Sequence, residues 1–350
     1  MTTEKRVKRY RSKYYNYDFY LSNGLFYRWG KTIEDDPLFS PVGPEIADIE
    51  IVQGKCKGMC DFCYKSNGEV ENHYMPLEKF KTLLSKLPDN LMQIAFGITD
   101  IDGNPDFFKI MEYTRSKGII PNYTTHGLDI TEDIAKKTSE LCGAVAVSIV
   151  NKNKTYDSIK MFTDAGMDQV NIHFTLSKET YYKAFEILKD ITEDNRLSKL
   201  NAIVFLSLKQ KGRGHNHSRL SFDKYRKLVD YAMKNNINIG FDSCSAPLFL
   251  AAMKDHDNFK EYEKLSESCE AYLFSIYINT FGECTPCSFL EDEGYDSFNV
   301  LECDDFMKDI WNHHSVSKWR DTLLKTASKC SIADCRMCPH YNLYPEELYK

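Results

Sequence analysis

Between about residues 46 and 250, short apolar runs alternate with longer amphipathic stretches. Short apolar runs are typical of strands buried in a parallel sheet, and apolar residues at i, i+3 and i+4 are typical of helices packed on such a sheet. The expected strands are 46–52, 93–97, 119–125, 144–150, 169–176, 201–208 and 237–242. The expected helices are 76–87, 106–117, 131–141, one that ends at 165, 178–191 and 222–234.

Repeated strand–helix units of about 25–35 residues imply a parallel sheet with its helices outside. Six or seven such units fit an α/β fold of the partial (β/α)6 TIM-like barrel type better than a complete eightfold barrel. The periodicity alone also permits an open, doubly wound sheet. In a barrel of this kind, we expect the functional residues at the carboxyl ends of the strands.

The regions on either side of the barrel differ in composition. Residues 1–45 are rich in aromatic residues, and the segments 15–21 and 25–29 predict a β-hairpin that covers the core or borders the substrate entrance. The charged, helical segment 251–268 leads into a C-terminal part, 269–350, which begins with a predicted hairpin of 272–279 and 283 onward. We therefore expect three regions, an extension (1–45), the barrel (46–250) and a small α+β module (251–350).

Composition narrows the functional classes. No apolar run approaches the ~20 residues of a membrane helix, and the basic N-terminus has no apolar core of a signal peptide, so we expect a cytoplasmic protein without a membrane partner. The net charge of −6 argues against a general nucleic-acid binder. Six Lys or Arg residues among the first thirteen favour a solvated tail, and nucleic acid remains the alternative partner there.

The twelve cysteines are grouped along the chain. Three lie close together at 56, 60 and 63, two are single at 142 and 244, and seven lie at 269, 284, 287, 303, 330, 335 and 338. In a reducing compartment such groups are typical of metal sites rather than disulfides. The grouping predicts two metal centres, one near the start of the barrel and one in the C-terminal module.

Cys56, Cys60 and Cys63 have the spacing C-x3-C-x2-C, in a loop directly after the first expected barrel strand. Thiolates hold the iron of iron–sulfur clusters, and three thiolates leave one iron of a [4Fe-4S] cluster open to a small molecule. A zinc site is the alternative, with His73 as the only close histidine. The loop, including Phe62 before the third cysteine, resembles the cluster loop of the radical S-adenosylmethionine (SAM) enzymes.

The resemblance implies a first [4Fe-4S] cluster that binds SAM and cleaves it reductively to a 5′-deoxyadenosyl radical, which abstracts a substrate hydrogen. It also implies an external electron donor such as flavodoxin or ferredoxin. Within this family we expect an oxidoreductase or maturase that modifies a peptide or protein. The alternatives are a dehydrogenase for a small molecule or nucleoside, a nucleic-acid-modifying enzyme, and a non-catalytic iron–sulfur or zinc protein.

The second strand ends in a segment, 96–105, that is similar to the family's Gly-Gly-Glu-Pro segment, which contacts the amino group of SAM. Gly97 is kept, Thr99 stands where glycine is common, and Asp100 stands where glutamate is usual. The resemblance implies that Asp100 accepts the amino group with help from Thr99. The alternative is an aspartate-rich turn with no ligand.

Further residues follow from the same resemblance. The segment 124–127 is similar to the family's Thr-Asn-Gly, and the contacts to the SAM carboxylate and ribose are expected at later strands. Arg213 lies in a glycine-flanked basic loop that suits an anion such as a carboxylate, with a solvated loop as the alternative. The resemblance implies SAM contacts by Thr125, Ser148 and Asn171 or His173, whereas Arg213 is a candidate from the composition of its loop alone.

Asp242 and Cys244 end the last expected strand of the barrel. A carboxylate or thiol at the barrel mouth can act as an acid, a base or a hydrogen-atom donor, so both are catalytic candidates. The alternative for Cys244 is a buried side chain that packs the core.

In the C-terminal module, Cys269, Gly282 and Cys287 have the spacing C-x12-G-x4-C, and a later C-x4-C-x2-C group ends at Cys338. This resembles the SPASM and twitch modules of the family, and the short, one-cluster form fits best. The resemblance implies a second, auxiliary [4Fe-4S] cluster, with Cys330 and Cys284 as rival ligands and zinc as the alternative metal. The implied ligands are Cys269, Cys287, Cys335 and Cys338.

Overall fold

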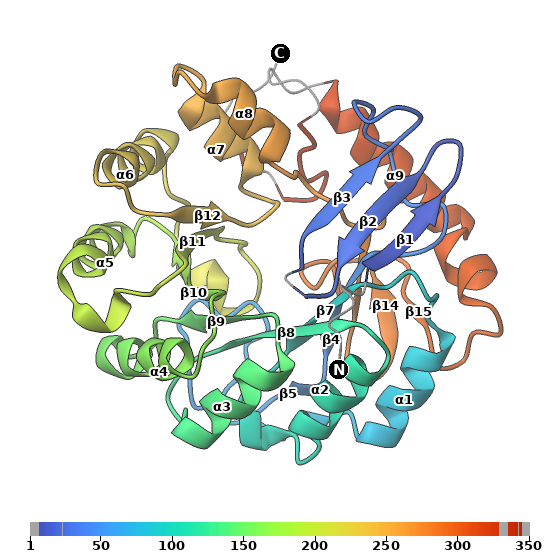
Figure 1. Cartoon of the computed structure of the whole chain (residues 1–350), viewed down its shortest axis with the longest axis horizontal. Helices are drawn as coiled ribbons and strands as arrows, with labels where there is room; N and C mark the ends of the chain where they lie inside the picture. The colour runs from blue at the N-terminus through green and yellow to red at the C-terminus, as the bar shows by residue number, and fades with distance from the viewer. Residues whose placement is uncertain (1–6, 23, 329–334, 342, 345–350) are drawn as a thin grey trace.

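The computed structural model describes residues 7–22, 24–328, 335–341 and 343–344 (Figure 1). Its centre is a curved sheet of seven parallel strands, each hydrogen-bonded to the next in chain order. This confirms the predicted α/β partial barrel. The strands are β4 (Ile46–Glu50), β7 (Gln93–Gly97), β8 (Ile120–Thr125), β9 (Ala144–Ser148), β10 (Val170–Leu176), β11 (Ala202–Ser207) and β12 (Ile239–Phe241).

A helix follows each of the first six barrel strands, and Figure 1 shows α3 to α6 along the outside of the curved sheet. Thr131 caps the first turn of the third of these helices, because its side chain accepts a hydrogen bond from the Ile134 N–H. The helices are α1 (Leu77–Lys86), α2 (Phe107–Ser116), α3 (Glu132–Leu141), α4 (Lys152–Asp164), α5 (Tyr181–Glu193) and α6 (Phe222–Lys234). Short 3₁₀ helices, η1 (Ile101–Gly103), η2 (Asn195–Leu197) and η3 (Gly212–Asn216), lie between them.

The two faces of the barrel strands differ in side-chain type. On β10, Ile172 and Phe174 are buried toward the helices, whereas Asn171, His173 and Thr175 face inward and stay partly accessible. The same alternation on β7 and β11 places small residues inward, at Ala95, Gly97 and Ala202. The inward face therefore carries small and polar residues beside apolar ones such as Val204 and Leu206, and it stays partly accessible, which suits a ligand better than a packed core.

The C-terminal region extends this sheet. The predicted hairpin is confirmed as β13 (Ser275–Ile278) and β14 (Glu283–Thr285), and β15 (Phe298–Asn299) pairs next to it. β13 also pairs in parallel with β4, so the ten strands form one sheet. The remaining elements are α7 (Ala246–Met253), α8 (Phe259–Leu265), the π-helix η4 (Met307–Trp311) and α9 (His314–Ala327). The three predicted domains and the two boundaries between them stay predictions.

The N-terminal region forms a separate three-stranded antiparallel sheet of β1 (Val7–Arg11), β2 (Asn16–Tyr20) and β3 (Phe26–Trp29). The β2–β3 hairpin is as predicted. The prediction of a solvated basic tail is wrong for residues 7–11. These residues form a strand whose Arg9 and Arg11 pair with Asp18. Among the described helices, none is both long and apolar enough to span a membrane.

Candidate cluster and cofactor site

The cysteine loop leaves the barrel just after β4. A two-stranded ladder of β5 (Val52–Gln53) and β6 (His73–Tyr74) holds its two ends together. Within the loop, the Cys56 N–H donates to the Gly68 carbonyl at 3.0 Å, and the Cys63 N–H donates to the Cys60 carbonyl at 3.2 Å. All three cysteines are free thiols of intermediate exposure. The loop therefore presents three thiols from one locally closed segment.

Arg213 fastens this loop from η3. Its Nε donates to the Cys60 carbonyl at 2.8 Å, and its Nη2 donates to the Asn67 carbonyl at 2.6 Å. The Arg213 backbone N–H donates to the Cys63 carbonyl at 3.0 Å. The structure thus assigns Arg213 a role in holding the cysteine loop, and its contact with SAM stays a prediction.

The electrostatics of the thiols fit a cluster. Burial raises the pKa of Cys56, and the backbone N–H groups of Gly58 and Met59 partly oppose this rise. Burial raises the pKa of Cys60 to about 11, and the charges of the Cys63 and Cys56 thiolates add to the effect. Thiolates whose charges raise one another's pKa are stabilised by a bound cation, so this donor set fits an iron–sulfur cluster.

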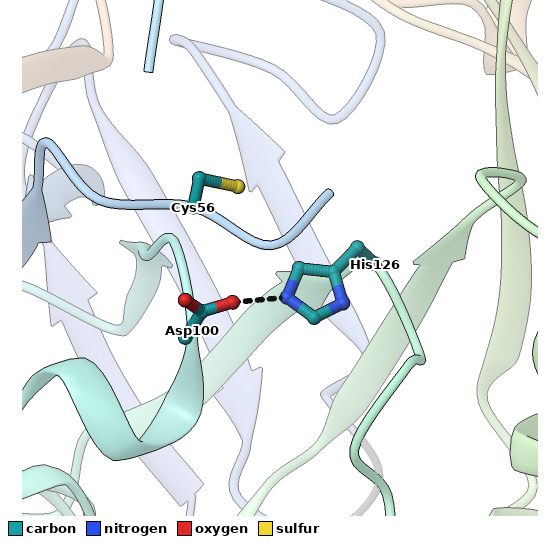
Figure 2. Close-up of side chains that lie close together, drawn as sticks. All are labelled: Cys56, Asp100 and His126. Atoms are coloured by element: carbon teal, nitrogen blue, oxygen red, sulfur yellow. Dashed lines mark hydrogen bonds and ion pairs between the residues drawn. The ribbon is translucent and has the colours of Figure 1, made fainter. Parts of the chain in front are cut away.

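Asp100 and His126 lie directly beside this loop (Figure 2). Asp100 precedes η1, just past the end of β7, and His126 follows β8. The His126 Nε2 lies 2.5 Å from the Asp100 Oδ1, and the Lys57 N–H donates to both Asp100 carboxylate oxygens at 3.2 and 3.3 Å. The Cys56 Sγ and the ligand atoms of Asp100 and His126 lie within 4.8 Å of one another. Asp100 is thus held at the cysteine loop, where the sequence places it.

Hydrogen bonding argues against a single metal ion at these three residues. The Leu128 N–H donates to the His126 Nδ1 at 3.1 Å, so that nitrogen carries the lone pair of the neutral ring. The proton is then on Nε2, which points at Asp100 and has no lone pair for a metal. Cys56 therefore remains available to a cluster. His73 lies on the exposed β6, and among the described residues it belongs to no group of three or more ligand atoms within 4.8 Å of one another.

Other predicted residues take varied positions. A side chain at Gly97 would meet the Glu50 backbone, with a Cβ–Cα distance of 3.2 Å, so this glycine permits close strand packing. The Thr99 Oγ1 is buried with no hydrogen-bond partner among the described residues, which leaves a polar group for a ligand. The Thr125 Oγ1 accepts from the Gly127 N–H, and the Phe62 ring packs edge-on against His217.

Three inward side chains lie together across β8, β9 and β10. Ser148 stands beside His173 in the strand register, and the His173 Nδ1 lies 3.3 Å from the Thr124 Oγ1. Burial lowers the pKa of His173 to about 4, so its ring is neutral near pH 7. Asn171 lies nearer the amino end of β10, where its Oδ1 accepts from the Asn201 side chain at 2.9 Å. The threonine of the segment 124–127 that lies beside His173 is Thr124, whereas the predicted contact of Thr125 with SAM stays a prediction.

Asp242 carries an ion pair that the sequence did not reveal. The buried Lys209 amino group contacts one Asp242 oxygen, and the Ser245 hydroxyl donates to the other. The Ser207 N–H also donates to Asp242, at 3.4 Å. This carboxylate is therefore already compensated by a buried cation.

Cys269 and Cys287 influence the ionisation of Cys244, and Tyr344 links Cys244 with Cys338. Burial raises the pKa of both Cys269 and Cys287 to about 12, and the charge of the Cys338 thiolate adds to each rise. Burial also raises the pKa of Cys244 well above its usual range, with further contributions from Cys269 and Cys287 that the Lys209 charge opposes. The Tyr344 hydroxyl donates to the Cys244 carbonyl at 2.8 Å and accepts from the Cys338 N–H at 3.5 Å.

These thiols fit a second cluster better than one zinc ion. In the described part of the chain, no three of them lie within 4.8 Å of one another. Cys335 is buried, and its neighbour Arg336 donates to the Cys269 carbonyl at 2.8 Å. The rival Cys284 is fully buried against Tyr272, and the rival Cys330 lies outside the described residues.

No protein-family model matches the sequence, and no curated protein matches it significantly. Solved structures do match. SuiB from Streptococcus suis, bound to precursor peptide SuiA, has a TM-score of 0.70 at 14% identity over 91% of this chain and 90% of that chain. anSMEcpe with bound AdoMet (SAM) has a TM-score of 0.63 at 16% identity over 88% and 89%. anSMEcpe with AdoMet and the Kp18Cys peptide has a TM-score of 0.61 at 16% identity over 87% and 93%. SuiB and anSME are radical SAM enzymes. The chain has the radical SAM fold.

Within the radical SAM fold, the sequence located the cysteine loop and Asp100 but missed Lys209 and the contact of His126 with Asp100. The available signal for the contact of His126 with Asp100 was the position of His126, a polar residue at the end of a strand. Lys209 sits in a loop of mixed composition whose only signal was its place after a strand.

Proposed function

We propose that this chain is a radical SAM enzyme that modifies a peptide. The observation that carries the proposal is the grouping of three unpaired loop thiols with Asp100, at the edge where β4 and β7 end, in a fold shared with SuiB and anSMEcpe. Cys56, Cys60 and Cys63 would hold a [4Fe-4S] cluster, whose chemistry when loaded is the reductive cleavage of SAM.

Asp100 would hold the SAM amino group. Its Oδ1 already accepts a hydrogen bond from the His126 Nε2, whereas the one contact of its Oδ2 within the described part of the chain is with the Lys57 N–H at 3.3 Å. A carboxylate oxygen accepts more than one hydrogen bond, so Oδ2 has capacity for an ammonium group. Thr99 offers its buried hydroxyl beside it, and Ser148 and His173 present polar groups on the inward face.

The substrate and partners follow from the same comparison. SuiB was solved with a precursor peptide and anSMEcpe with a peptide, and both align with most of this chain, which supports a peptide substrate. A second cluster on Cys269, Cys287, Cys335 and Cys338 would carry electrons. An external donor such as flavodoxin or ferredoxin would supply them in a reducing compartment, such as the cytoplasm, that suits the free thiols.

The test is anaerobic reconstitution with iron and sulfide, followed by SAM and a strong reductant. We expect 5′-deoxyadenosine from the wild type and none from Cys63→Ala. The matched control is Cys142→Ala, which removes a buried thiol at the end of α3. A wild-type protein that carries its full iron and sulfide but forms no 5′-deoxyadenosine would overturn the proposal.

A further inference from the structure

His126 has a geometry that the proposed site does not yet use. It is only 8% exposed and lies between two partners, the Asp100 carboxylate on Nε2 and the Leu128 N–H on Nδ1. The Leu128 contact sets the tautomer, so the Nε2 proton is directed at Asp100. The ring is therefore a fixed donor to this carboxylate.

The same ring packs against the cysteine loop. A Cβ at Gly58 would lie 3.3 Å from the His126 Cβ and 3.4 Å from the Cys56 Sγ. The loop backbone at Gly58 therefore packs closely against both His126 and the Cys56 thiol. The Lys57 N–H, from the same loop, also reaches Asp100. One ring thus joins the end of β8 to the loop and to the segment after β7.

An aspartate can reach a given ligand atom from fewer side-chain orientations than a glutamate can. Its carboxylate stands one methylene closer to the backbone, so its reach depends on holding one side-chain orientation. His126 and Lys57 bond the Asp100 carboxylate from two sides and leave Oδ2 the less occupied oxygen. Charge-assisted hydrogen bonds of this kind are stronger than neutral ones.

We infer that His126 is a positioning residue that orients Asp100 to receive the SAM ammonium group. The inference rests on the proposed function and adds a residue that acts through Asp100 rather than on SAM itself. His126 then sets SAM affinity without being a cluster ligand.

The test compares His126→Leu with His126→Gln in anaerobically reconstituted protein. Leucine fills much of the ring's volume without a donor, whereas the glutamine amide can still donate to Asp100. We expect His126→Leu to weaken SAM binding about tenfold or more, since it removes a hydrogen bond to a charged group. His126→Gln should stay within about threefold of the wild type. Isothermal titration with SAM measures both.

Two further readouts separate positioning from a structural role. Iron and sulfide content should equal the wild type in both variants, and the KM for SAM should rise in His126→Leu with kcat for 5′-deoxyadenosine little changed. The control is Asp129→Asn, which removes an exposed carboxylate that contacts the Lys57 amino group. It should bind SAM as the wild type does.

The outcomes are distinct. Equal SAM affinity in the wild type and His126→Leu overturns the inference and leaves the proposed function standing. Iron loss in either His126 variant also overturns it, because the ring would then act on the cluster. A fully loaded wild type that binds no SAM overturns the proposed function and the inference with it.

Discussion

Asp48 is an inward carboxylate in the middle of β4, between the buried Ala47 and Ile49. Its side chain faces the accessible interior of the barrel. The protein atoms around it displace water from the charged carboxylate, and this desolvation raises its pKa from the ordinary 3.8 to about 6. No described group forms a hydrogen bond or ion pair with it. The folded state therefore holds the Asp48 proton more tightly than the unfolded state does. The ionised carboxylate destabilises the fold as pH rises from about 4 to 6, and the cost stays constant above that range.

We predict that Asp48→Asn stabilises the protein more at pH 8 than at pH 5. The amide removes the cost of ionisation, which is complete at pH 8 and partial at pH 5. Anaerobic denaturant unfolding at the two pH values measures the difference in the free energy of unfolding. The control is Asp164→Asn on the surface, where Lys160 and Lys199 lower the carboxyl pKa, so no such gain is expected. An equal gain at both pH values would contradict the explanation.

Among single residues, the sequence predicted those groupings that involve residues close together along the chain. The spacing of Cys56, Cys60 and Cys63 predicts their grouping, since a short loop brings them together whatever the rest of the chain does. The pairing of His126 with Asp100 spans 26 residues, and that of Lys209 with Asp242 spans 33. Such pairs depend on which strand ends are neighbours and on the direction of the side chains. The local sequence pattern predicts neither.

The segment η3 and the cysteine loop form one unit at the scale of elements. Arg213 bonds two loop carbonyls through its side chain and a third through its own N–H. Gly212 permits this approach, because a Cβ there would lie 2.4 Å from the Tyr64 carbonyl oxygen and its φ is +52°. The loop after β11 thus clamps the loop after β4 across the barrel mouth.

We predict that Arg213→Ala releases iron from the first cluster site faster than the wild type. Losing two hydrogen bonds of about 1 kcal/mol each corresponds to a rate increase of roughly tenfold or more. Iron release to a chelator, followed with the EPR signal of each cluster, should show loss at the Cys56 site and retention at the auxiliary site. Lys227→Ala, on the exposed side of α6, is the control. Unchanged release would show that η3 does not stabilise the loop.

Element types followed from periodicity, because helices and buried strands differ in the spacing of their apolar residues. The parallel pairing of β13 with β4 did not. The apolar pattern of β13 predicts a strand in a hairpin. It does not predict that β13 also pairs with β4, which it can do because the partial barrel leaves that edge of β4 open. The short β1 was missed because the six basic residues within and around it are typical of a solvated tail, although Asp18 compensates two of them.

At the scale of the whole molecule, the two cysteine groups are joined by direct contacts. Tyr64, next to Cys63, packs against Phe289 with ring centroids 4.4 Å apart, and Phe289 follows Cys287 by two residues. Beside them, the Lys65 amino group contacts Glu50 on β4 and Glu291 beyond the C-terminal hairpin. Because β13 continues the barrel sheet, these contacts hold the C-terminal thiols in a constant position relative to the cysteine loop.

Cys335 is one of the four expected ligands of the auxiliary cluster, and Cys244 is its rival. With two [4Fe-4S] clusters, the wild type should hold about eight irons per chain. If Cys335 is a ligand, Cys335→Ala should fall toward about four, while SAM still binds at the first cluster. Cys244→Ala is the matched comparison, because Cys244 adjoins Cys269 and Cys287 and shares the Tyr344 hydroxyl with Cys338. Iron analysis and Mössbauer spectroscopy of the two variants decide between them. Iron loss in Cys244→Ala with retention in Cys335→Ala would transfer the ligand to Cys244, and the auxiliary cluster would then be anchored on the barrel itself.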